Sequence, residues 1–98
     1  TTLRLWYYLY SYDTVQFDYL AVDIHPYPTG TLERLWVDGS PLWSPYVPWR
    51  SGWREATITL DGYRGQWVVA RIALAMTNAD GYYNTWAYVD DVWVDIRR

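Results

Sequence analysis

The sequence has no cysteine and no lysine, and only one phenylalanine, one methionine and one histidine in 98 residues. Without cysteine, disulfide bonds and thiolate metal sites are excluded, so a hydrophobic core must stabilise the fold. The single histidine, His25, is too few for the three or four ligands of a usual zinc site. It is also the only candidate base for serine-type nucleophilic catalysis, and no nucleophile motif accompanies it.

Long hydrophobic runs are missing as well, and so is a surplus of positive charge. No stretch of about 18 apolar residues occurs, so we expect no membrane insertion. The formal net charge is −3 and all eight basic residues are arginine, which argues against a nucleic-acid partner. No signal-peptide pattern occurs in the sequence, which starts at Thr1. We expect one domain over residues 1–98, as a processed product or as part of a longer protein.

Tryptophan and tyrosine are abundant, with 8 and 11 residues respectively. Both have a large apolar body and a polar tip, which suits half-buried faces and binding surfaces. Arginine stacks on such rings and pairs with carboxylates. Because a free monomer with so much aromatic surface is prone to aggregate, we expect part of this surface to be covered in the working state.

Short runs of β-branched and aromatic residues, bounded by Gly, Pro, Asn and Asp, predict β-strands along the whole chain. The expected strands are residues 3–10, 17–25, 31–37, 54–60, 66–77 and 85–96. Their number and short turns predict an all-β fold, an antiparallel two-sheet jelly-roll-like sandwich of about six strands. The expected core is Leu3, Leu5, Tyr7, Leu20, Val22, Ile58, Leu60, Val68, Ile72, Leu74, Val92 and Val94.

A long loop is predicted over residues 40–53, with several prolines and tryptophans, and long ordered loops are often functional. Three interpretations stay open: the loop caps one sheet, anchors a protein interface, or forms a platform for sugar rings. The candidate contact residues are Trp43, Tyr46, Trp49 and Trp53 in this loop and Trp6, Tyr8 and Tyr10 on the first strand, and Trp67, Trp86 and Trp93 extend the aromatic surface.

Several segments occur in a familiar order, namely LWYY (5–8), FDYLAV (17–22), LW (35–36), Trp53 before residues 56–60, YRGQ (63–66) and WAYVDDV (86–92). Their order resembles that of MAM-like jelly-roll modules. It is most similar to the C-terminal modules of secreted bacterial metallopeptidases of the immune-inhibitor-A type. The resemblance implies a non-enzymatic jelly-roll module of an extracellular or cell-surface protein, used for adhesion, oligomerisation or ligand contact.

Such modules have a longer segment before the strand that matches residues 3–10. We therefore expect the sandwich to be completed by a strand from a neighbouring subunit or another part of a parent protein, because open sheet edges attract strands.

Some of these modules also carry structural calcium, and Asp18, Asp90 and Asp91 lie where they place acids. Carboxylate oxygens are ligands that calcium prefers. The alternative is structural: Asp91 bonds backbone amides at a bulge and Asp18 pairs with an arginine. Asp90 and Asp91 are adjacent in a predicted strand and are expected on opposite faces, which excludes them as a glycosidase pair.

The function expected from the sequence is a non-enzymatic extracellular interaction or assembly module, with protein as the main partner and no cofactor beyond the calcium considered above. Two alternatives stay open. One is a self-polymerising subunit of an extracellular filament or layer. The other is a carbohydrate-binding module that uses the tryptophan-rich loop.

Overall fold

Strands make up most of the computed structural model, which describes residues 1–77 and 84–96. The described elements are β1 (Thr2–Ser11), β2 (Asp18–Pro26), β3 (Glu33–Asp38), β4 (Trp49–Thr59), the short 3₁₀ helix η1 (Asp61–Tyr63), β5 (Val68–Met76) and β6 (Thr85–Asp95). No helix among these residues is long and apolar enough to cross a membrane.

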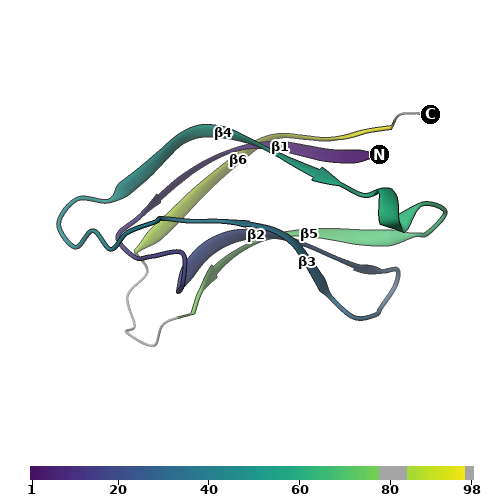
Figure 1. Cartoon of the computed structure of the whole chain (residues 1–98), viewed down its shortest axis with the longest axis horizontal. Coiled ribbons are helices and arrows are strands. Elements are labelled where there is room, and N and C mark those ends of the chain that lie inside the picture. The colour runs from purple at the N-terminus through teal and green to yellow at the C-terminus, as the bar shows by residue number, and fades with distance from the viewer. Residues whose placement is uncertain (78–83, 97–98) are drawn as a thin grey trace.

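The strands form two sheets that pack face to face (Figure 1). One sheet has the order β4-β1-β6 and the other the order β3-β2-β5, and every paired neighbour is antiparallel. Among the strands that the structure describes, only β2 and β3 follow one another in the same sheet, and each other pair of consecutive strands lies in different sheets. The predicted all-β, antiparallel two-sheet sandwich is confirmed.

The core lies between the two central strands, β1 and β2. Apolar residues alternate along β1, so one face of this strand is buried and the other points outward. Leu5 and Val22 are fully buried, and the Tyr7 ring meets the Trp36 ring edge to face at 5.0 Å. The central cluster is Leu3, Leu5, Tyr7, Leu9, Leu20, Val22, Ala56 and Ile58.

Three residues predicted in the core are exposed instead. Leu74 on β5 is 37% exposed, and Val92 and Val94 on β6 are 49% and 53% exposed. Both strands are edge strands of their sheets. Because an edge strand has a neighbour on one side only, apolar residues on its inner face are covered only in part.

The predicted long loop is also shorter than expected. β4 begins at Trp49, so the loop spans residues 39–48 and the last third of the predicted loop is strand. Gly52 has a φ of 69°, and the pairing of β1 with β4 shifts between Tyr8 and Tyr10. This β-bulge interrupts the alternation that identifies strands in a sequence.

Candidate binding site

Aromatic side chains line the outer face of the β4-β1-β6 sheet. On β1, Trp6, Tyr8 and Tyr10 point outward because Leu5, Tyr7 and Leu9 point into the core. Each outward residue lies opposite one residue of β4 and one of β6, so the face consists of cross-strand rows.

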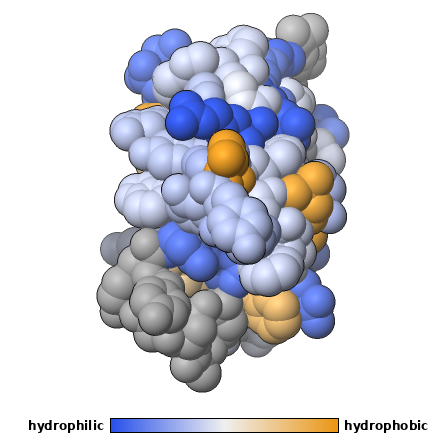
Figure 2. All heavy atoms as spheres, turned by 90° about the vertical axis from the view of Figure 1, so that its left-hand side faces the viewer, coloured by the Kyte–Doolittle hydropathy of each residue, from blue (hydrophilic) through white to orange (hydrophobic). Residues whose placement is uncertain are grey.

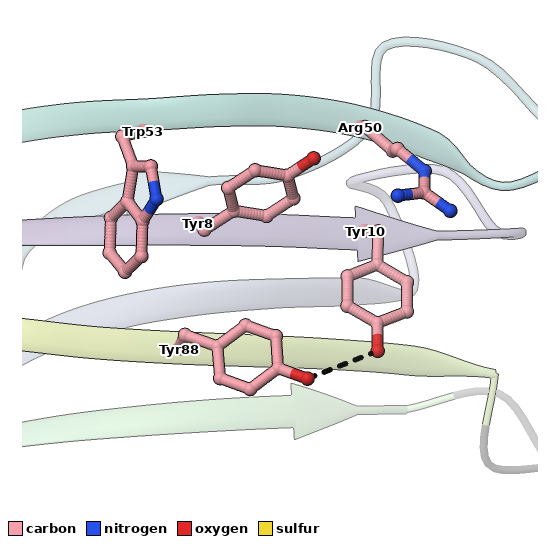
Figure 3. Close-up of a pocket in the computed structure, with 5 residues that line it drawn as sticks. All are labelled: Tyr8, Tyr10, Arg50, Trp53 and Tyr88. Carbon is pink, nitrogen blue, oxygen red and sulfur yellow. Dashed lines mark hydrogen bonds between the residues drawn. The ribbon is translucent and has the colours of Figure 1, made fainter.

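Two of these rows hold most of the rings. Tyr8 lies between Trp53 and Tyr88, and Tyr10 lies between Arg50 and Trp86. The Tyr8 and Trp53 rings meet edge to face at 5.8 Å, and the Tyr10 and Trp86 rings stack at 5.1 Å. Figure 3 shows five side chains of this face, which come from three strands: Tyr8, Tyr10, Arg50, Trp53 and Tyr88. The rings therefore hold one another in place, while Trp53, Trp86 and Tyr88 stay exposed.

The bulge in β4 brings Arg50 and Trp53 onto this face. Residues three positions apart point to opposite faces in a regular strand. The bulge adds one residue to β4 between them, so Arg50 and Trp53 both point to the outer face. Gly52 takes the left-handed conformation that a bulge of this kind requires. The Ser51 hydroxyl accepts a hydrogen bond of 2.8 Å from the Leu9 backbone N–H, which fixes the bulge to β1.

A second bulge lies in β6 at Asp91, whose φ is 51°. Its backbone N–H donates a 2.8 Å hydrogen bond to the Asp90 carboxylate. The prediction that Asp90 and Asp91 lie on opposite faces is wrong, because the bulge interrupts the alternation. Both residues border one hollow together with Trp6 and Trp53.

Two adjoining hollows occupy the face. The first has a volume of about 270 Å³ and is lined by Trp6, Trp53 and the two aspartates. The second, of about 320 Å³, is lined by Tyr8, Tyr10, Arg50, Trp53 and Tyr88 (Figure 3). Trp53 is the wall that they share, so an extended ligand can contact both.

The polar groups around the hollows differ in charge from one end to the other. Acids border the first hollow, whereas the Arg50 guanidinium lies 5.6 Å from the centre of the Tyr10 ring at the second. The hydrogen bond between the Tyr10 and Tyr88 hydroxyls, 3.4 Å long, raises the pKa of Tyr10 above its ordinary value. The Tyr10 hydroxyl is therefore neutral at physiological pH and is able to donate or accept hydrogen bonds.

Of the predicted contact residues, Trp6, Tyr8, Tyr10 and Trp53 lie together on this face. The predicted loop platform does not form as one surface. Trp49 points inward and packs against the core, with the Arg54 guanidinium 5.3 Å from its ring centre.

Trp43 and Tyr46 lie in the loop of residues 39–48, where they are 68% and 92% exposed. Figure 2 views the end of the sandwich at which this loop lies. The hydrophobic patches on that end are small and are separated by paler and more polar residues. On the outer face of the β4-β1-β6 sheet, by contrast, neighbouring rings contact one another across the strands.

Tyr88 and Arg50 belong to the site but were not predicted from the sequence. Tyr88 could have been found from the sequence, because it lies two positions from Trp86 on β6 and therefore points to the same face. Arg50 had no such signal, since its side depends on the bulge.

The three acids proposed for calcium do not form one cluster, because Asp18 lies apart from Asp90 and Asp91. Asp18 is buried at the start of β2, where the Thr85 hydroxyl donates a 2.5 Å hydrogen bond to its carboxylate. Asp90 lies five residues beyond Thr85 on β6, which is roughly 16 Å along a strand. No group of three or more His, Cys, Asp or Glu that could hold a metal occurs in residues 1–77 and 84–96.

Asp18 instead belongs to a buried polar cluster that joins the two sheets. The Thr85 hydroxyl also lies 2.6 Å from the Ser11 hydroxyl, so β1, β2 and β6 meet here. Because buried polar groups are costly unless they are hydrogen-bonded, this cluster fixes how the sheets stack at this end.

No family model, curated protein or solved structure matches the chain. The likeness to MAM-like modules therefore stays a prediction from the sequence.

Proposed function

We propose that this protein is a non-enzymatic interaction module, and that the aromatic outer face of the β4-β1-β6 sheet is its contact surface. The observation that carries the proposal is the gathering of exposed rings around Trp53, with two hollows between them. Such rings on the outside of a sheet add nothing to the core, and exposed aromatic patches of this kind are typical of binding sites.

A protein partner suits the composition of this face best. Tryptophan, tyrosine and arginine are the residues that contribute most binding energy at protein interfaces. Trp53 and Tyr88 are each 55% exposed, so burial under a partner would remove a large apolar area from water. The rings are already held by their neighbours, which reduces the conformational entropy lost on binding. Adhesion or oligomerisation at a cell surface or outside the cell is the setting that the family resemblance suggests.

A carbohydrate is the second candidate ligand, and the joined hollows favour it. Their volumes of about 270 and 320 Å³ are near the lower end of the range for ligand sites. Sugar rings stack on aromatic side chains, while Asp90, Asp91 and Arg50 are placed to hydrogen-bond hydroxyl groups. On this alternative the site is the sheet face, centred on Trp53, and not the loop.

The test compares Trp53→Ala with Trp43→Ala, a matched control in the loop of residues 39–48. Each variant is used to capture proteins from the secreted and surface fraction of the source organism, and each is titrated with cello-, xylo-, manno- and chito-oligosaccharides. We expect Trp53→Ala to weaken binding at least tenfold, since removal of a central aromatic anchor costs about 2 kcal/mol or more, whereas Trp43→Ala retains it.

A protein that is lost with Trp53→Ala and kept with Trp43→Ala supports the first candidate. Oligosaccharide binding with the same dependence supports the second. Equal loss in both variants, or partners that neither substitution affects, contradicts the proposal.

A further inference from the structure

β5 differs from the other three edge strands of the sandwich. Proteins protect open sheet edges with bulges and charged residues, because unpaired backbone groups attract other strands. β3, β4 and β6 each contain a bulge or register shift and three charged residues. β5 pairs with β2 in regular register over nine residues and has only one charge, Arg71.

The inner face beside this edge is also open. Along β5 the inner-facing residues are apolar, and Ala70 and Leu74 are exposed. A hollow of about 480 Å³ lies at one end of the same side, lined by Val68 and Ala70 from β5 and by Val94 and Ile96 from the C-terminal part of the chain. Unpaired backbone and uncovered apolar side chains therefore occur together along β5.

The overall dimensions are those of an elongated sandwich, which has long strand edges for its mass. The chain exposes 6569 Å², whereas a compact monomer of this mass exposes about 5,900 Å². The excess follows from the elongated shape, whose axes measure 48, 27 and 17 Å, so that long strand edges are accessible to a partner. The radius of gyration is 14.8 Å, compared with about 12.6 Å for a compact domain of this length.

We propose that two copies of the chain pair through β5, antiparallel about a two-fold axis at Ile72. Ile72 is the midpoint of Val68–Met76, so this register pairs the whole strand. It places Ala70 opposite Leu74 of the second copy, a small residue against a large one. On the outer face it places Arg71 opposite Ala73 of the second copy, so no like charges meet.

Charge makes β5 a better self-pairing edge than β6. The same symmetry about the midpoint of Thr85–Asp95 would set Asp90 against Asp90 of the second copy, and like charges directly opposite each other are destabilising. Pairing through β5 extends the β3-β2-β5 sheet into a continuous sheet across both copies. The inner-facing apolar residues of the two β5 strands then lie side by side at the axis, so the exposed Ala70 and Leu74 side chains cover one another.

Cysteine cross-linking tests this register, since the chain contains no cysteine of its own. Ile72→Cys places two thiols across the axis, where opposed Cα atoms lie about 5 Å apart and a disulfide is allowed. Leu74→Cys is the control, because its counterpart is offset by four residues, about 13 Å along the strand. We expect mild oxidation to link most of Ile72→Cys as a dimer and to leave Leu74→Cys unlinked.

A charge pair gives a second test that does not alter the core. Ala73→Arg places an arginine opposite Arg71 of the second copy, and the two-fold axis repeats this like-charge pair once. We expect the affinity of the dimer to fall roughly tenfold, whereas Ala73→Asp should raise it. Light scattering with chromatography measures the molecular mass at chain concentrations from the micromolar to the millimolar range. The unmodified chain, expected at twice 11.7 kDa, is the reference for both variants.

If the unmodified chain stays at 11.7 kDa throughout this concentration range, the proposal is wrong. The edge of β5 would then be available only to a strand from a different polypeptide. Open-ended assemblies would overturn the proposal too, because a two-fold contact closes after two copies. Equal cross-linking of both cysteine variants would contradict the register.

Discussion

The two outer faces of the sandwich satisfy their polar groups in different ways. On the β3-β2-β5 sheet, the Asp23 carboxylate is fully buried between two arginines, with Arg34 Nε at 2.9 Å and an Arg71 guanidinium nitrogen at 3.2 Å. On the β4-β1-β6 sheet, exposed aromatic rings contact one another and leave hollows between them. Two sheets of the same size thus carry a closed ion cluster on one side and an open aromatic surface on the other.

The difference separates a structural face from a binding face. Around Asp23 the groups are paired with each other: Arg34 also donates to the Tyr19 hydroxyl, and its guanidinium lies 4.9 Å from the centre of that ring. Hydrogen bonds from Arg34 and Arg71, which outweigh the effect of burial, hold the pKa of Asp23 below its usual value. By contrast, the rings around Trp53 have exposed surface that a ligand can cover.

The largest expected effect on stability comes from Asp23→Ala. The substitution removes a buried acceptor of two arginines and leaves a small cavity. Since Arg34 and Arg71 are 45% and 55% exposed, water partly replaces the lost bonds, and we expect a loss of about 2 kcal/mol in the free energy of unfolding. Urea denaturation measures it.

Trp53→Ala is the matched variant on the opposite face. Because Trp53 is 55% exposed, its removal should cost less stability than Asp23→Ala. It should weaken ligand binding at least tenfold, whereas Asp23→Ala should retain binding. If both variants lost stability equally and binding equally, the division into a structural and a binding face would be wrong.

Acid should weaken the same ion cluster to a smaller extent. A carboxyl whose pKa is lowered by folding stabilises the protein above its unfolded pKa, and this contribution is lost as the pH falls through the folded pKa. The ordinary value for Asp23 is 3.8 and its folded pKa is lower. The difference in the free energy of unfolding between the unmodified protein and Asp23→Asn should therefore be largest at neutral pH. It should shrink progressively below pH 3.8.

Denaturation of both proteins from about pH 6 to about pH 2 measures this difference. A gap between the two curves that stays constant over the whole range would show that Asp23 does not act through its charge.

The smallest effect concerns the bulge that orients Arg50 and Trp53. Gly52→Ala should cost about 1 kcal/mol, because alanine is disfavoured in the left-handed conformation. Gly62→Ala is the control: a Cβ meets no atom within 4 Å at either position, but only Gly52 has a positive φ. Thermal unfolding compares the two, and ligand titration shows whether the bulge also places Trp53. Equal stability of both variants would contradict the role of the bulge.

Much of this protein follows from local patterns in its sequence. Two-residue alternation is a property of the chain itself, so it predicts the inner row of Leu3, Leu5 and Tyr7 and the outer row of Trp6, Tyr8 and Tyr10. The abundance of β-branched and aromatic residues, with turn residues between the runs, likewise determined the all-β sandwich.

Only the tertiary structure decided how the rows meet. The bulges at Gly52 and Asp91 change which face later residues occupy, and a bulge forms against a partner strand rather than from local preference. The separation of Asp18 from Asp90 and the exposure of Leu74 depend on which strands lie at the edges. Strand order is set by contacts between residues far apart in the chain, and no local pattern encodes it.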